Sequence, residues 1–84
     1  MEIYNTNGII NGTKDELIVF DDGSFRYTTH NCDGEEIIHD DCEAYSVGNK
    51  GGLRIKYGNG SSFSFKDYST GEIDKRWEKI NDLE

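Results

Sequence analysis

The stretch LRIKYGNGSSFSFK, residues 53–66, decides the fold that the sequence predicts. Apolar and polar residues alternate on both sides of the loop Gly58-Asn59-Gly60, which is typical of two antiparallel strands joined by a tight turn. A three-residue loop gives the pairs Tyr57–Ser61, Ile55–Phe63 and Leu53–Phe65. One face of the hairpin is then apolar, whereas a two-residue turn mixes apolar and charged side chains on each face. We therefore expect the three-residue loop.

Two Asp-Gly pairs upstream, Asp22-Gly23 and Asp33-Gly34, predict two more hairpins. As a two-residue turn, the first sets four large side chains on one face, while the second gives a less regular pattern. The expected pairs are Phe20–Phe25 and Ile18–Tyr27 in the first hairpin, and His30–Ile37 and Tyr27–Asp40 in the second.

After Lys66 the apolar spacing changes from that of a strand to that of a helix. Residues 69–72 have the Ser-x-x-Glu form of a capping box, which satisfies free backbone N–H groups at the start of a helix. Ile73, Trp77 and Ile80 then recur at helical spacing. The pattern predicts an amphipathic helix over about residues 70–82, with its Trp77 face against the sheet.

The N-terminal segments Ile3-Tyr4 and Ile9-Ile10 are expected to add one or two strands. We therefore predict an α+β fold in a single domain over residues 1–84. It consists of a twisted antiparallel sheet of five or six strands within residues 2–67, with a partial barrel as an alternative, and the C-terminal helix. A chain of this length buries a modest share of its surface, so a homodimer is an open alternative.

The net charge of −8 is unevenly distributed. Residues 15–43 carry ten acidic residues and one basic residue, Arg26, whereas residues 50–66 carry four basic residues and no acidic one. No segment reaches the roughly 20 apolar residues of a membrane-spanning helix, and residues 1–5 lack the features of a signal peptide. The sequence therefore predicts a cytoplasmic protein with no membrane partner, and its charge disfavours direct binding of nucleic acid.

Both histidines and both cysteines lie close together, as His30, Cys32, His39 and Cys42. Such nitrogen and sulfur donors form structural zinc sites, so these four residues are the metal candidates. In the expected hairpin the first three project from one face and Cys42 from the other, which opposes a shared metal. A reducing cytoplasm also disfavours a Cys32–Cys42 disulfide. We expect no metal or cofactor, with the cysteines acting as small apolar side chains.

Eight acidic side chains form the candidate partner-binding surface. They are Asp21, Asp22, Asp33, Glu35, Glu36, Asp40, Asp41 and Glu43. Alternate carboxylates on a strand lie about 6.7 Å apart, which is of the same order as the roughly 3.4 Å of helix axis per charge on a DNA strand. Such a surface suits the basic channel of a nucleic-acid-binding protein, and an acidic face that only aids solubility is the alternative. No nucleophile motif with a base and an orienting group is identified, so we expect no enzyme activity.

This small chain, with the acidic run CDGEEIIHDDCE at residues 32–43 and no catalytic motif, resembles in type the small phage-encoded inhibitors of host defence. These include anti-CRISPR and anti-restriction proteins and DNA mimics; bacterial immunity proteins that neutralise nuclease toxins are similar in type. The resemblance implies a protein-binding inhibitor, in a bacterial host cell if phage-encoded, that occludes the basic surface of a nucleic-acid-binding enzyme. Tyr27 or Tyr45 is the expected aromatic anchor of the contact.

A second interpretation is a non-enzymatic structural or adaptor module. The predicted strands and final helix resemble, in outline, pleckstrin-homology-type domains, and a small barrel is a related form. The resemblance implies that apolar faces pair with another chain.

Overall fold

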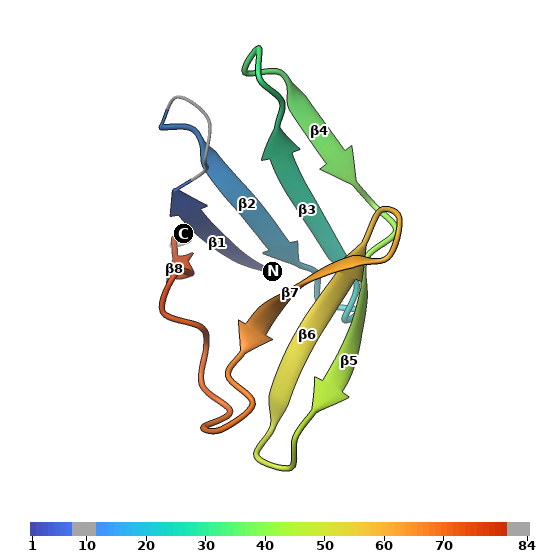
Figure 1. The fold of residues 1–84 in the computed structure, drawn as a ribbon, viewed down its shortest axis with the longest axis vertical. Coiled ribbons are helices and arrows are strands. Elements are labelled where there is room, and N and C mark those ends of the chain that lie inside the picture. Colours follow the sequence, from blue (N-terminus) through green and yellow to red (C-terminus); the bar gives the residue numbers. More distant parts are fainter. Residues whose placement is uncertain (8–11, 81–84) are drawn as a thin grey trace.

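The computed structural model describes residues 1–7 and 12–80, and strands form its framework (Figure 1). The described residues form eight strands, β1 (Glu2–Asn7), β2 (Lys14–Val19), β3 (Phe25–His30), β4 (Glu36–His39), β5 (Glu43–Val47), β6 (Gly52–Tyr57), β7 (Ser61–Lys66) and β8 (Glu78–Lys79).

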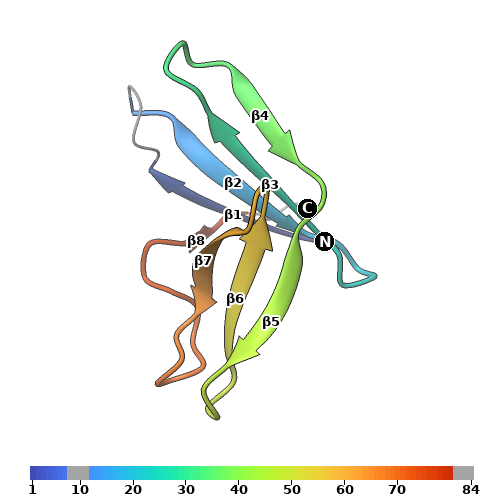
Figure 2. The same ribbon diagram turned by 45° about the vertical axis from the view of Figure 1, so that its right-hand side comes forward.

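The strands form two antiparallel sheets, a five-stranded sheet of order β4-β3-β2-β1-β8 and a three-stranded sheet of order β5-β6-β7. The chain passes from β4 directly into β5, and the sheets diverge from that connection (Figure 2). The α+β prediction is wrong, because the described residues are all-β, and so is the prediction of one sheet of five or six strands or a partial barrel. The predicted strand at Ile9-Ile10 lies outside the described residues.

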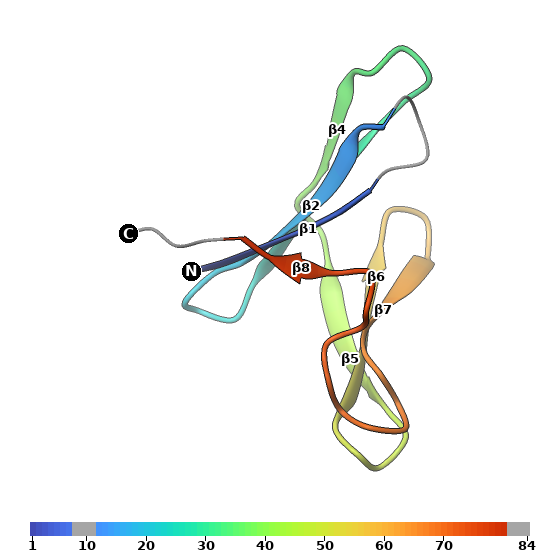
Figure 3. The same cartoon turned by 90° about the vertical axis from the view of Figure 1, so that its left-hand side faces the viewer.

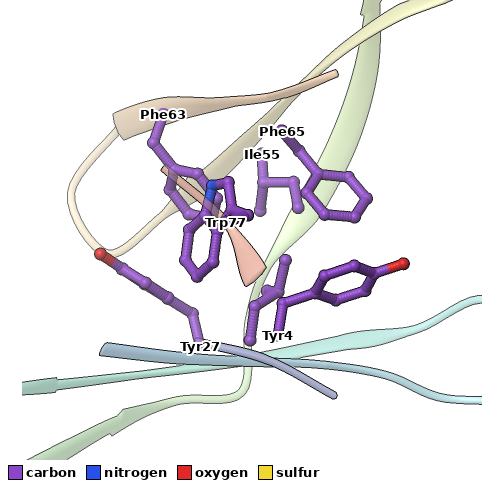
Figure 4. Close-up of a cluster of buried hydrophobic side chains, with 7 residues drawn as sticks. Tyr4, Tyr27, Ile55, Phe63, Phe65 and Trp77 are labelled. Atoms are coloured by element: carbon purple, nitrogen blue, oxygen red, sulfur yellow. The ribbon is translucent and has the colours of Figure 1, made fainter. Parts of the chain in front are cut away.

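An aromatic core fills the space between the two sheets (Figure 4). Its buried side chains are Tyr4, Leu17 and Tyr27 from the five-stranded sheet, Ile55, Phe63 and Phe65 from the three-stranded sheet, and Trp77 from the segment before β8. The rings of Tyr27 and Phe63 lie 4.6 Å apart across the sheets, and those of Tyr4 and Phe65 lie 5.2 Å apart, edge to face. Such pairs add to the hydrophobic stabilisation of the core.

The first two hairpins have loops of three residues, not two. Ser24 follows the loop of the β2–β3 hairpin and accepts a hydrogen bond from the Phe20 N–H. The third loop residue, Gly23, has φ +89°, which suits a type I turn followed by a left-handed residue. Gly34 occupies the same place in the β3–β4 loop, with φ +83°. The predicted registers of both hairpins are therefore wrong by one residue.

This shift decides which side chains enter the core. Leu17 lies opposite Tyr27 and both are buried, whereas Ile18 lies opposite Arg26 on the outer face of the sheet. In the β6–β7 hairpin the predicted loop and the Ile55–Phe63 pair are confirmed. A register shift next to Leu53 sets that residue opposite Lys66 instead of Phe65, so the last predicted pair is wrong.

The predicted C-terminal helix is absent from the described residues, which end at residue 80. The side chain of Asp67 accepts a hydrogen bond from the Ser69 N–H at 2.7 Å. The Glu72 N–H is bound by the Thr70 hydroxyl at 3.2 Å, not by the Ser69 side chain that a capping box requires. These local side-chain hydrogen bonds compete with a helix, and a helix of this length has little stability of its own.

The segment after β7 instead connects the edges of both sheets (Figure 3). Ile73 bridges to Lys66 of β7, and the Ile80 N–H donates to the Ile3 carbonyl of β1 at 2.7 Å. Between these two points Trp77 is buried, and its indole N–H donates to the Ser64 carbonyl at 3.3 Å. The prediction that Trp77 packs on the sheet holds, although no helix presents it.

Candidate functional site

The candidate acidic residues gather at opposite ends of the β3–β4 hairpin. We call Asp21, Asp22, Asp40 and Asp41 cluster I, which combines the β2–β3 turn with the β4–β5 connection. We call Asp33, Glu35 and Glu36 cluster II, which lies at the β3–β4 turn. The length of β4 separates the two clusters, about 13 Å for four residues. Glu43 begins β5, opposite Lys56, so the eight candidates do not form one continuous patch.

Nearby donors hold the carboxylates of Asp21, Asp22 and Asp40 in cluster I. Asp40 Oδ1 accepts from Arg26 Nε at 2.8 Å, and the N-terminal ammonium contacts Asp21 Oδ1. Hydrogen bonds from the Ser24 hydroxyl and backbone N–H, at 2.6 and 2.9 Å, lower the pKa of Asp22. These exposed ion pairs contribute little stability, but they neutralise part of the local charge.

Cluster II is organised by Asn31, a residue that the sequence analysis did not identify. Asn31 Oδ1 accepts from the backbone N–H groups of Asp33 and Glu35 at 2.9 and 3.0 Å. Its amide nitrogen donates to Glu35 Oε1 at 3.0 Å. An Asn two residues before Asp-Gly is the signal that predicts such a side-chain turn. The turn keeps the cluster II carboxylates exposed around a fixed backbone.

The structure separates the two predicted aromatic anchors. Tyr27 is buried in the core, where burial and the charge of Asp15 raise its pKa, so it is not available to a partner. Tyr45 lies on β5 and is 42% exposed. A hydrogen bond with the Ser62 side chain lowers the pKa of Tyr45. Only Tyr45 remains a candidate anchor.

The four metal candidates do not converge. His39 lies opposite Tyr27 and shares its face of the sheet. His30 is three residues from Tyr27 on β3, so the two imidazoles project from opposite faces. The expected shared face for His30, Cys32 and His39 is therefore wrong, because it depended on the wrong turn length. His39 stacks on Tyr27 with ring centroids 5.7 Å apart. Within residues 1–7 and 12–80, no three His, Cys, Asp or Glu side chains are grouped so that they could hold a metal ion.

The cysteines occupy different environments. Cys32 is exposed in the β3–β4 turn, while Cys42 is half-buried against the core. The thiol of Cys42 donates to the His39 carbonyl at 3.4 Å, and burial raises its pKa. Both thiols are free.

Two exposed apolar side chains, Ile37 and Ile38, lie between the acidic clusters. They are 42% and 55% exposed, and they project from opposite faces of β4. The sequence predicted only an acidic hairpin in this stretch, although the central Ile-Ile pair is the signal that marks an apolar strand within it.

An open cleft of about 650 Å³ lies beside β7. Aromatic residues of the core line it, together with the charged side chains of Asp15, Arg54, Asp74 and Arg76. The charged groups are engaged with neighbours: Arg54 donates to the Ser62 hydroxyl at 3.1 Å, and Asp15 accepts from the Tyr27 hydroxyl at 3.2 Å. The Arg76 guanidinium lies 5.9 Å from the Trp77 ring. The charged side chains of this cleft are thus held by contacts within the chain, and the Asp74 carboxylate likewise accepts from the Arg76 N–H at 3.1 Å.

Comparison of the chain with protein-family models, curated proteins and solved structures finds no match. The described residues include no helix with the length and apolarity that crossing a membrane requires. Among the described residues, the acidic clusters and the strand between them are the features that carry a functional hypothesis.

Proposed function

We propose that this chain is a non-enzymatic, protein-binding inhibitor that occludes the basic nucleic-acid-binding surface of a target enzyme. The observation that supports it is the display of clusters I and II at the two ends of a short exposed strand. Defence nucleases, restriction enzymes and toxin nucleases are the target classes that such a surface suits, and the proposed compartment is the cytoplasm of a bacterial cell. The pleckstrin-homology-like and barrel forms are not part of the proposal, because the described residues lack the helix and the sheets are open.

The mechanism follows from charge and geometry. Lysine and arginine side chains that normally contact phosphates pair instead with the two groups of carboxylates. The net charge of −8 accelerates the encounter with a basic surface, and added salt weakens that attraction. Tyr45 supplies an exposed aromatic contact beside Glu43 on the neighbouring strand β5.

The test is affinity capture from a bacterial lysate at low and moderate salt, with competition by added duplex DNA. Two charge reversals probe the clusters: Asp40→Lys with Asp41→Lys, and Glu35→Lys with Glu36→Lys. The control, Glu72→Lys with Glu78→Lys, changes the net charge equally at exposed positions outside both clusters.

We expect a nucleic-acid-binding enzyme to be captured by the unaltered chain and by the control, and to be displaced by DNA. Each cluster reversal should reduce capture by tenfold or more, since several close charge pairs are lost. Equal capture by the control and the cluster variants, or capture that DNA does not reduce, contradicts the proposed mechanism.

A second candidate, an adaptor module, is favoured by the exposure of Ile37 and Ile38. It predicts a partner that is retained after both charge reversals and lost on Ile38→Ser. The same capture experiment therefore distinguishes the two classes.

A further inference from the structure

The two sheets are closed along one side and open along the other. On the closed side, residues 73–80 bridge to β7 and pair with β1 through β8. On the opposite side β4 and β5 are edge strands, and neither has a second neighbour among the described residues (Figure 1). An edge strand presents unpaired backbone N–H and C=O groups, which are a template for another extended segment.

The hydrogen-bonding direction along β4 follows from its turn. The Asn31 N–H donates to the Glu35 carbonyl, which makes these two residues a hydrogen-bonded pair. Such pairs alternate with non-hydrogen-bonded pairs along an antiparallel ladder. Ile37 and His39 therefore direct their backbone groups toward β3, whereas Glu36 and Ile38 direct theirs outward.

The charges around this edge select its occupant. Clusters I and II flank β4 at both ends, and β4 itself carries no Lys or Arg. In a two-fold antiparallel pairing with a second copy, centred on Ile37 or on Ile38, cluster I of one copy meets cluster II of the other. Like charges in these positions oppose self-pairing. An extended segment with basic and apolar side chains complements both the acids and the exposed isoleucines.

We propose that the outer edge of β4 binds an extended, basic segment of a partner protein as an additional strand. The outward backbone groups of Glu36 and Ile38 supply the hydrogen bonds, Ile37 and Ile38 contact apolar side chains on the two faces, and clusters I and II pair with Lys or Arg. This inference rests on the proposed function and specifies the part of the target that is recognised.

The test uses two synthetic peptides of equal charge, RVRVRVR and RPRPRPR, both acetylated and amidated. The first forms a strand readily, while the three prolines of the second lack N–H donors and hold that peptide in a polyproline II conformation, so it pairs poorly with a sheet edge. Binding is measured by titration of the ¹⁵N-labelled full chain, followed through amide chemical shifts, and hydrogen exchange is measured for the Ile38 amide.

We expect RVRVRVR to shift the amides of residues 36–40, to slow exchange at Ile38, and to bind at least about tenfold more tightly than RPRPRPR. Each backbone hydrogen bond accounts for roughly a fivefold change in affinity. Equal binding of the two peptides overturns the strand addition but leaves the acidic inhibitor in place. Absence of binding by both peptides overturns the inference at this edge.

Ile38→Pro and Ile38→Ala separate the backbone from the side chain. Both substitutions shorten the apolar contact, but only Ile38→Pro removes the outward N–H, and it leaves the β3–β4 hydrogen bonds in place. We expect RVRVRVR to bind Ile38→Pro about fivefold more weakly than Ile38→Ala. Equal affinities refute the strand addition, and the amide spectrum of each variant shows whether its fold is retained.

Two further measurements test the acidic contacts and the choice of a basic partner over a second copy. RVRVRVR binding that is insensitive to the cluster charge reversals refutes the acidic mechanism while the backbone pairing stands. Shifts at residues 36–40 that depend on protein concentration without peptide show that a second copy occupies the edge, which overturns the choice of a basic partner.

Discussion

Replacement of Gly71 by Ala tests the loop that stands where a helix was expected. Gly71 has φ +77°, and a Cβ there would lie 2.1 Å from the Lys50 carbonyl oxygen. The left-handed backbone costs about 1–2 kcal/mol for a residue with a Cβ. The clash is with backbone, so the 67–72 loop and the β5–β6 turn must move apart, which adds about 1–3 kcal/mol by analogy with overpacking. The expected loss is thus roughly 2–5 kcal/mol.

Gly23→Ala is the matched control for this substitution. Gly23 has φ +89°, but nothing lies within 4 Å of its added Cβ, so only the backbone term applies. The two losses should therefore differ by the overpacking term of about 1–3 kcal/mol, in an 84-residue domain whose total stability is roughly 4–13 kcal/mol. Urea unfolding followed by the fluorescence of the buried Trp77 measures both. Losses that agree within about 0.5 kcal/mol would refute the close approach of Gly71 to Lys50.

Two other predictions concern titration and reactivity. Burial and a hydrogen bond to Glu2 raise the pKa of Tyr4 from 10.0 to about 12, so the resulting stabilisation is full below pH 10 and declines as the pH rises through about 12. Urea midpoints measured across that interval should fall less steeply for Tyr4→Phe; identical slopes would contradict the raised pKa. The exposed Cys32 should react with a thiol reagent faster than the half-buried Cys42, whose raised pKa disfavours the thiolate. Cys32→Ser should abolish the fast phase, and a persisting fast phase would contradict this assignment.

The registers show why one hairpin was largely predictable and two were not. In β6–β7 apolar and polar residues alternate, so a one-residue slip exposes Ile55 and Phe63 and can be rejected from sequence. Four apolar residues follow one another from Leu17 in β2 to Phe20 just after it, so both registers set apolar pairs on one face. Three-dimensional packing resolves the ambiguity by burying Leu17 with Tyr27.

The C-terminal segment was mispredicted because its apolar spacing serves a different structure. Ile73 and Trp77 do pack on the core, as a helix would have placed them. The intervening Asp74 accepts from the Arg76 N–H at 3.1 Å, and its own N–H donates to the Phe65 carbonyl at 2.8 Å. Carbonyls at a sheet edge and side-chain oxygens thereby accept hydrogen bonds from the backbone N–H groups of this segment. In a helix, carbonyls of the segment itself would accept them. No local pattern reveals that a sheet edge is available to the segment.

The candidate acids were identifiable from sequence, but their division into two clusters was not, because it depends on the hairpin ends. That division bears on whether the acidic residues only aid solubility or also bind a partner protein. Acidic residues at strand ends protect an edge against unwanted pairing, and this explains clusters I and II without a partner. It does not explain Ile37 and Ile38, since an edge built only for protection would carry polar or charged residues at its centre. An edge with acidic ends and an apolar centre suits the basic, extended segment that we propose as its partner.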